Sequence, residues 1–336
     1  QAKISTILAS GDKNIDLISV NDEMISEFKH KGYLEPLEKN VMTEEVRDSF
    51  PQKYLESICE ENGHIYSVPF QMDIMMFWVN QELLKQAGLD EIKNTGDFDI
   101  LQKSLKNPDQ YAYGDAWENT HVYNSLSQFV NFWGGDYFDW TDPKTKDAAR
   151  YMKSMLDEKN TSPAQFVDQY EQMEEKFIRG KYGCVFMYTS ALGTFLDADV
   201  YGKNKIHMAP LPVLHKKKAT NIATWQYVLN NASQNKDAAV RFLQYAAGYE
   251  GSTEYAKIMK SYPARVDVIE NEDIDLEGID MIRKYLREYT LNARPLCENS
   301  MGAVSDMGKL FQGYVLGQCE EDSFFEQAQN CINTYY

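Results

Sequence analysis

Short apolar runs alternate with amphipathic stretches along most of the chain. Runs rich in β-branched and aromatic residues indicate buried strands, at residues 15–20, 66–69, 74–79, 181–188 and 225–229. Stretches with apolar residues three or four apart indicate helices, at residues 22–31, 147–158, 169–178, 236–247 and 281–289. Asn80 is placed to cap a further helix that ends before Gly88. Strands and helices in alternation predict an α/β fold, with a buried parallel strand at residues 15–20.

The chain opens inside a helical pattern of the same kind. Ile4, Ile7 and Leu8 share one face, and Gly11 fits a C-terminal cap. No capping residue and no initiator methionine stand before them. We therefore expect that an N-terminal piece precedes residue 1 in the whole protein.

Size and charge narrow the class of protein. The chain has 336 residues, of which 43% are hydrophobic and 13% aromatic, so it is long enough for two cores and is not a disordered chain. A formal net charge of −17 disfavours nucleic acid and anionic membranes as partners, and favours a neutral or cationic ligand. No apolar stretch reaches the ~18 residues of a membrane span.

Residue types that carry catalysis or bind metals form no recognisable arrangement. The five cysteines contain no CxxC pair, and the five histidines contain no HExxH. Phosphate-binding loops, dinucleotide glycine motifs and GxSxG elbows are also missing from the sequence. We predict no catalytic residue, no metal and no cofactor. Carboxylates are abundant, however, so a glycosidase pair stays open as an alternative.

Aromatic and polar residues gather instead in predicted loops and at strand ends. Apolar rings beside amides and carboxylates suit a sugar, whose ring faces are apolar and whose edges carry hydroxyls. The competing interpretation is that each tryptophan fills a core. The residues concerned are Trp117, Trp133, Asp136, Tyr188, Trp225 and Gln226.

A series of short segments resembles, in the same order, motifs of the extracellular solute-binding protein family 1, which includes the maltose-binding protein. The segments cover essentially the whole chain. They are residues 7–18 (ILASGDKNIDLI), 31–37 (KGYLEPL), 62–69 (NGHIYSVP) with 77–80 (FWVN), 84–89, 132–136 (FWGGD), 177–186 (FIRGKYGCVF), 209–212 (APLP), 235–243 (NKDAAVRFL), 262–265 (YPAR) and 293–295 (ARP). At residues 14–16 the chain departs from the usual Pro-Asp of the family.

The resemblance implies a two-lobed, hinge-connected periplasmic-binding-protein-like fold of type II. The lobes would be an N-terminal one from residues 1–72 and 230–292 and a C-terminal one from residues 73–229 and 293–336. The chain would cross between them near residues 70–74, 226–230 and 292–296. Members of the family begin with a strand, a helix and a strand that have no counterpart here, so we expect an N-terminally truncated fold that lacks roughly 40 to 60 residues.

The function that the resemblance implies is capture of a carbohydrate for an ABC importer. Ligand between the lobes would stabilise a closed state, which then docks on the permease subunits. We expect a monomer outside the cytoplasm, in the periplasm or at the cell surface, which meets the membrane only through a lipid anchor outside this chain. The alternatives are a glycoside-active enzyme and a binding protein of the same fold for a polyamine or peptide.

Two residues near the expected crossings complete the predicted site. Asp73 follows a strand near the first crossing, and its carboxylate is able to accept two hydroxyl hydrogen bonds. Arg294 stands before Pro295 near the third crossing, where it would reach the ligand or hold the hinge by a salt bridge. The predicted ligand-binding residues are therefore Asp73, Trp117, Trp133, Asp136, Tyr188, Trp225, Gln226 and Arg294.

Overall fold

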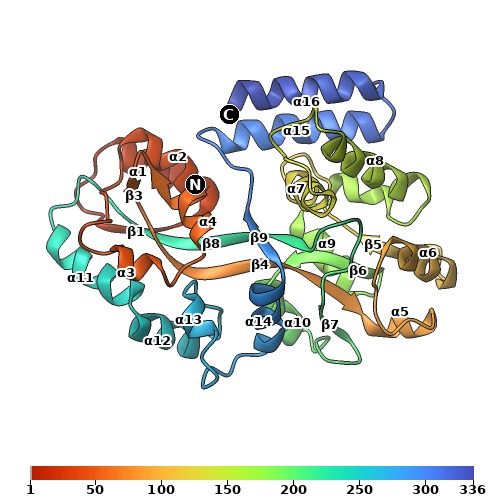
Figure 1. Ribbon diagram of the computed structural model, residues 1–336, viewed down its shortest axis with the longest axis horizontal. Coiled ribbons are helices and arrows are strands. Elements are labelled where there is room, and N and C mark those ends of the chain that lie inside the picture. The colour runs from red at the N-terminus through yellow and green to blue at the C-terminus, as the bar shows by residue number, and fades with distance from the viewer. Residues whose placement is uncertain (1) are drawn as a thin grey trace. The chain divides into compact units, whose positions relative to one another are not determined.

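A computed structural model describes residues 2–336 of the chain (Figure 1). The chain divides into two compact units, each assembled from several segments. Unit 1 comprises Gln1–Asp73, Ile222–Arg283 and Asn292–Ser300, and unit 2 comprises Ile74–Asn221, Lys284–Leu291 and Met301–Tyr336. Elements with residues in both units are β4 (Val68–Asn80), β8 (Ala219–Leu229), α14 (Ile279–Glu288), β9 (Thr290–Ala293) and α15 (Ser300–Val315).

Unit 1 combines a short helical N-terminal part with a later group of helices. Its helices and 3-10 or π turns are α1 (Ala2–Ala9), α2 (Asp22–Phe28), η1 (Lys29–Lys31), α3 (Glu44–Arg47), α4 (Gln52–Tyr54), η2 (Leu55–Cys59), α11 (Lys236–Ala247), α12 (Tyr249–Met259) and α13 (Val266–Ile269). Its own strands are β1 (Leu17–Asn21), β2 (Glu60–Glu61) and β3 (His64–Ile65).

The strand β1 pairs with β8, and the pair runs antiparallel. Val20 lies opposite Gln226, and Asn21 lies opposite Trp225. The sequence predicts a buried parallel strand here, and that prediction is wrong. Ser19 is exposed while Val20 is fully buried, so one face of β1 points out of the core. The outward face was hidden in the sequence because apolar residues occupy both faces at the start of the strand.

Local signals set the helix ends as the sequence predicts. The Asn21 side chain accepts a hydrogen bond from the Met24 amide at 3.1 Å and caps α2. Gly32 ends the following turn with φ +68°, a conformation that favours glycine. Asn80 caps the helix after β4 in the same way, by accepting from the Glu82 and Leu83 amides.

Unit 2 has helices packed around its strands, which belong to a seven-stranded sheet of the order β1-β8-β4-β6-β5, with β7 paired to β4 and β9 paired to β8. The helices and the 3-10 turn are α5 (Gln81–Gln86), α6 (Thr95–Ser104), α7 (Val122–Trp133), α8 (Pro143–Asp157), η3 (Pro163–Val167), α9 (Tyr170–Ile178), α10 (Ala191–Asp197) and α16 (Glu321–Tyr335). The strands are β5 (Tyr111–Gly114), β6 (Tyr182–Tyr188), β7 (Ile206–Ala209) and the second part of β4.

The strand β6 lies at the centre of unit 2. It runs antiparallel to β4 and parallel to β5, while β7 pairs antiparallel with β4. Every residue of β6 is buried, as expected for a strand covered on both faces. Phe186 from β6 meets the rings of Phe129 and Phe132 from α7, with centroids 6.2 and 5.4 Å apart, so α7 is fixed to the sheet by an aromatic core.

The helical pair α15 and α16 packs side by side within unit 2 (Figure 1). Tyr314 and Phe324 stack with their ring centroids 4.5 Å apart, which joins the two helices. Gly308 brings α15 against the chain at Asn119, because a Cβ at residue 308 would lie 1.9 Å from the Asn119 carbonyl oxygen. The segment that precedes α7 is thus held from outside by α15.

Two expectations about elements need correction. Residues 66–69 and 74–79 were expected as separate strands, but residues 68–80 form the single strand β4. The position predicted to be a loop at Trp133 is the last turn of α7, and Gly134 ends that helix with φ +71°. Several polar residues of α7, such as Ser125 and Gln128, are buried, so the spacing of apolar residues alone did not indicate this helix.

Candidate functional site

A small recess in unit 2 brings together residues from β4, α7, α9, β6 and the segment after β5. It holds about 20 Å³, which is room for about one water-sized group. Polar and apolar side chains share its wall. They are Met75, Asp115, Ala116, His121, Asn124, Ser125, Tyr170, Met173, Phe186 and Tyr188.

Asp115, which lines the recess, is held by several hydrogen bonds. Its buried carboxylate accepts hydrogen bonds from the Tyr113 hydroxyl at 2.8 Å, the Ser125 hydroxyl at 2.6 Å and the Trp117 Nε1 at 2.8 Å. The Ala116 amide donates a fourth bond at 2.8 Å. Burial raises the pKa of Asp115, and these bonds oppose that rise. Asp115 therefore ties the segment after β5 to α7.

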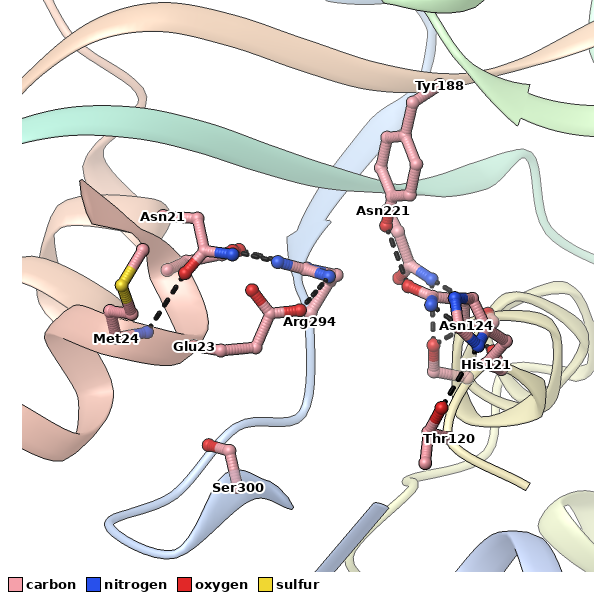
Figure 2. A network of polar contacts seen from close by, with 12 residues as sticks. Asn21, Glu23, Met24, Thr120, His121, Asn124, Tyr188, Asn221, Arg294 and Ser300 are labelled. Atoms are coloured by element: carbon pink, nitrogen blue, oxygen red, sulfur yellow. Dashed lines mark hydrogen bonds and ion pairs between the residues drawn. The ribbon is translucent and has the colours of Figure 1, made fainter. Parts of the chain in front are cut away.

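A chain of neutral hydrogen-bonding groups leads from Asn124 (Figure 2). The Tyr188 hydroxyl donates to Asn124 Oδ1 at 3.0 Å, and the Tyr170 hydroxyl accepts from the Tyr188 amide at 2.8 Å. Asn221 Nδ2 donates to the Asn124 carbonyl at 3.2 Å and to Ser127 Oγ at 2.7 Å. The amides and phenols are thereby held in place by the backbone and by one another.

The His121 imidazole and the Glu118 carboxylate lie beside these hydrogen-bonded groups, at the start of α7. Glu118 Oε2 is 3.0 Å from His121 Nδ1 and accepts from the Thr120 amide at 2.9 Å and hydroxyl at 2.6 Å. Burial alone would raise the pKa of Glu118, but the bonds from Thr120 and His121 lower it below its usual value. The Nδ1 contact leaves the Nε2 edge of His121 as the part of the ring that can meet a ligand.

The predicted site residues of unit 2 differ in accessibility. Tyr188 is 8% exposed and lines the recess. Trp117 is fully buried, against Phe311, with its centroid 5.4 Å away. Trp133 is 7% exposed and stacks on His215 at an interplanar angle of 2°. Asp136 is exposed and caps its own turn through the Phe138 amide. The recess brings together Tyr188 and residues that the sequence did not single out.

Unit 1 also holds a network of polar side chains, which is a buried cluster of ion pairs around Arg294 (Figure 2). The Arg294 Nε donates to Asp22 Oδ2 at 3.0 Å, and its Nη1 donates to Glu23 Oε1 at 2.6 Å. A further bond joins Arg294 Nη2 to Asp22 Oδ1. Arg294 is 9% exposed and Asp22 is fully buried, and these ion pairs join two segments of the same unit. The roles predicted for Arg294, at the ligand or at the hinge, stay predictions.

The other predicted residues of unit 1 have separate surroundings. Gln226 is fully buried, where its Oε1 accepts from Ser67 and its Nε2 donates to the Tyr54 hydroxyl at 3.0 Å. Trp225 points the other way from β8 and is 39% exposed. Asp73, the last residue of unit 1 in β4, is 9% exposed. The ligand-binding roles of these residues stay predictions.

Comparison with known proteins decides the family. The model of the bacterial extracellular solute-binding protein family matches residues 1–253. The chain belongs to that family. Among curated relatives, the arabinooligosaccharide-binding protein of Bacillus subtilis is 22% identical over 286 residues, which is 81% of this chain and 65% of the relative. A probable amino-acid ABC transporter periplasmic-binding protein of Sinorhizobium fredii is 24% identical over 239 residues, 68% of this chain and 54% of the relative.

Solved structures show the fold of this family member. A tagatose-bound ABC transporter solute-binding protein of Thermotoga lettingae superposes with a TM-score of 0.83 at 18% identity, over 99% of this chain and 88% of that one. The maltose-bound MalE3 protein of T. maritima gives 0.82 at 17% identity, over 99% and 88%. The predicted α/β fold of the two-lobed solute-binding proteins is thereby confirmed. The chain spans about half to two thirds of the length of the two curated relatives.

Two further findings bear on this solute-binding protein. Within residues 2–336, none of the helices combines the length and the apolarity that crossing a membrane requires. The sequence-based prediction did not include His121, Asn124, Tyr170 and Asn221, although one signal marks the first two. Polar residues recur three or four apart along α7, at His121, Asn124, Gln128 and Asn131, and this stripe faces Asn221 of β8.

Proposed function

We propose that this protein captures a neutral carbohydrate as the extracytoplasmic binding component of an ABC importer. The observation that carries the proposal is the set of neutral hydrogen-bonding groups at the recess of unit 2. Amide, phenol and imidazole groups of Asn124, Tyr188 and His121 match the hydroxyls of a sugar, which both donate and accept. The name of the Bacillus subtilis relative and the sugars bound in structures of the same fold support this ligand class.

Two buried charged groups, Arg294 in unit 1 and Asp115 in unit 2, bear on charged ligands. An amino acid needs a cation for its carboxylate, and the Arg294 guanidinium in unit 1 is engaged by two carboxylates. A polyamine needs carboxylates, and the Asp115 carboxylate in unit 2 is surrounded by four donors. These two charged groups are therefore already occupied by partners within the protein.

Our proposal divides the predicted residues by their exposure. Tyr188 in unit 2, and Asp73 and Trp225 in unit 1, contact the ligand. Trp117 and Gln226 are fully buried, so they hold neighbouring groups in place. Binding closes the two lobes on the ligand, and the closed form delivers it to the permease subunits without any covalent step. The protein acts as a monomer outside the cytoplasm, in the periplasm or at the cell surface through a lipid anchor.

Isothermal titration calorimetry across four ligand classes tests the proposal. The classes are neutral mono- and oligosaccharides, amino acids, polyamines and short peptides. We expect a saccharide to bind, with the same saccharide recovered unaltered after prolonged incubation. Binding confined to an amino acid, a polyamine or a peptide would overturn the carbohydrate assignment, and hydrolysis of the saccharide would overturn the assignment as a transport protein.

A further inference from the structure

Trp225 in unit 1 differs in exposure from the other tryptophans of the chain. Its side chain is 39% exposed, whereas each of the other four is 7% exposed or less. Tyr227, two residues along the same face of β8, is covered by Phe70 and Phe242, whose ring centroids lie 4.1 and 5.4 Å away. Among residues 2–336, no aromatic ring packs on Trp225 in this way. The indole is therefore a large apolar surface that a ligand can cover.

The strand that carries Trp225 is fixed from its buried side. Thr224 and Gln226, the two neighbours of Trp225 in sequence, are 2% exposed or less. Thr224 Oγ1 donates to the Tyr54 hydroxyl at 2.8 Å, and Gln226 Nε2 donates to the same hydroxyl at 3.0 Å. The backbone on both sides of Trp225 is thus held before any ligand arrives, which lowers the cost of ordering the site on binding.

Asn21 stands beside this indole. It lies directly opposite Trp225 in the antiparallel pair of β1 and β8, so the two side chains project from the same face with their Cβ atoms about 5 Å apart. Asn21 Oδ1 accepts from the Met24 amide at 3.1 Å, which sets the orientation of the side-chain amide (Figure 2). In the described part of the chain, Asn21 Nδ2 donates to no acceptor. An oriented donor and an exposed ring therefore occur side by side.

A second asparagine shows that helix capping does not require such a ring. Asn80, like Asn21, is the last residue of a strand and caps the helix that follows. Asn80 lies opposite Ile206, which is 3% exposed, so the residue across from it is a buried aliphatic side chain. Of these two capping asparagines, Asn21 alone faces an exposed indole.

We propose that Asn21 is a sugar-binding residue, which together with Trp225 holds one pyranose unit of the ligand. The apolar face of the pyranose lies on the indole, and a hydroxyl at the edge of the sugar accepts a hydrogen bond from Asn21 Nδ2. This proposal rests on the proposed carbohydrate function and deepens it, because it names the form of the sugar and a second residue of unit 1.

The variants Asn21→Asp and Asn21→Ser test the role of the amide. Both keep an oxygen that caps α2 about as well as asparagine does, and neither keeps the Nδ2 donors. The probes are glucose, galactose, maltose, cellobiose and xylobiose. For those that bind the unmodified protein, we expect calorimetry to give about three- to tenfold weaker binding in both variants.

Asn80→Ser is the matched control, because it makes the same change at the other capping asparagine. Its affinity should equal that of the unmodified protein, and thermal unfolding should show similar stability for all three variants. Full affinity in both Asn21 variants would overturn the proposal. Weaker binding in Asn21→Asp alone would also overturn it, because the added charge and not the lost donor would then be the cause.

A double-variant cycle tests whether Asn21 and Trp225 hold the same sugar unit. In the Trp225→Ala background the pyranose no longer lies on a ring, so we expect Asn21→Ser to weaken binding less than about twofold. Equal losses with and without the indole would overturn the proposal. If none of the five probes binds but another saccharide does, the pyranose site fails and the carbohydrate function stands. Binding of no saccharide would overturn both.

Discussion

Each unit holds a network of polar side chains, and the two networks differ in charge. The cluster in unit 1 joins the Arg294 guanidinium to the carboxylates of Asp22 and Glu23. The cluster in unit 2 is built mainly from amides and hydroxyls around Asn124. Charges buried together satisfy one another, whereas neutral groups keep acceptors and donors that a ligand can use. In our proposal, the first cluster has a structural role and the second a binding role.

This contrast separates two measurable quantities, the free energy of unfolding and the ligand affinity. Removing one member of a buried ion pair leaves a charge without its partner and destabilises the fold strongly. Removing one neutral hydroxyl at a recess costs about 1 kcal/mol of stability, less than breaking a buried ion pair, and changes the contacts that a ligand makes. The predictions that follow test whether the two effects fall in different units.

Arg294→Met should have the largest effect. It leaves the fully buried Asp22 carboxylate without its cation, so we expect a loss of about 3 to 5 kcal/mol in the free energy of unfolding. Urea denaturation followed by circular dichroism measures it. The double variant Arg294→Met with Asp22→Leu is the control, and it should recover part of the loss, because the fully buried charge goes while Glu23 still lacks its cation. A loss below about 1 kcal/mol in the single variant would show that the pair is not structural.

Trp225→Ala tests whether unit 1 also supplies a ring to the ligand. Its indole is 39% exposed on the outer face of β8. Loss of stacking on a sugar face should weaken binding about tenfold, with little change in stability. Tyr245→Ala removes a ring of similar exposure, 49%, from the same unit, and should leave affinity unchanged. Equal affinities of the two variants in calorimetry would remove Trp225 from the site.

Tyr188→Phe tests whether the neutral cluster of unit 2 contacts the ligand. It deletes the hydroxyl that donates to Asn124 and, in our proposal, meets the ligand. We expect saccharide affinity to fall about three- to tenfold, which corresponds to about 0.7 to 1.4 kcal/mol, with a smaller loss of stability. Tyr227→Phe in unit 1 is the matched control and should bind like the unmodified protein. Full affinity in Tyr188→Phe would be evidence against the neutral cluster as the binding site.

The smallest effect concerns acid pH. The folded-state pKa of Glu118 lies below its ordinary value of 4.5, so ionised Glu118 contributes stability above that value. This contribution is lost as the pH falls from about 4.5 through the lower folded-state pKa, because protonation weakens the bonds from Thr120 and His121. We expect a modest fall in the free energy of unfolding over that pH range, and Glu118→Gln should lack this step. An identical pH profile for the two proteins would contradict the role of Glu118.

Much of the fold is predictable because its signals are local. Gly32 and Asn80 mark helix ends by their own backbone or side-chain preferences, and the structure has those ends where the sequence indicates them. The direction of β1 is not local, because it depends on which distant strand pairs with it. An apolar run looks the same in a parallel and an antiparallel pair, so the sequence could not decide between them.

The candidate site was less predictable for two physical reasons. Its contacts join residues far apart in sequence, such as Arg294 with Asp22 and Asn221 with Asn124. Burial also depends on what covers a residue, so Trp117, fully buried, and Trp225, partly exposed, could not be told apart by residue type. Polar residues do recur at helical spacing along α7, and this spacing marks Asn124.

The most direct test of the account is the change in unfolding free energy that each ligand class produces. A saccharide at 100 times its dissociation constant should stabilise the protein by about 2.7 kcal/mol. At that same concentration the gain in Tyr188→Phe should be clearly smaller, and amino acids and polyamines should give no gain. A stabilisation by an amino acid or a polyamine, with none from any neutral saccharide, would contradict the claim that the neutral cluster of unit 2 binds a sugar.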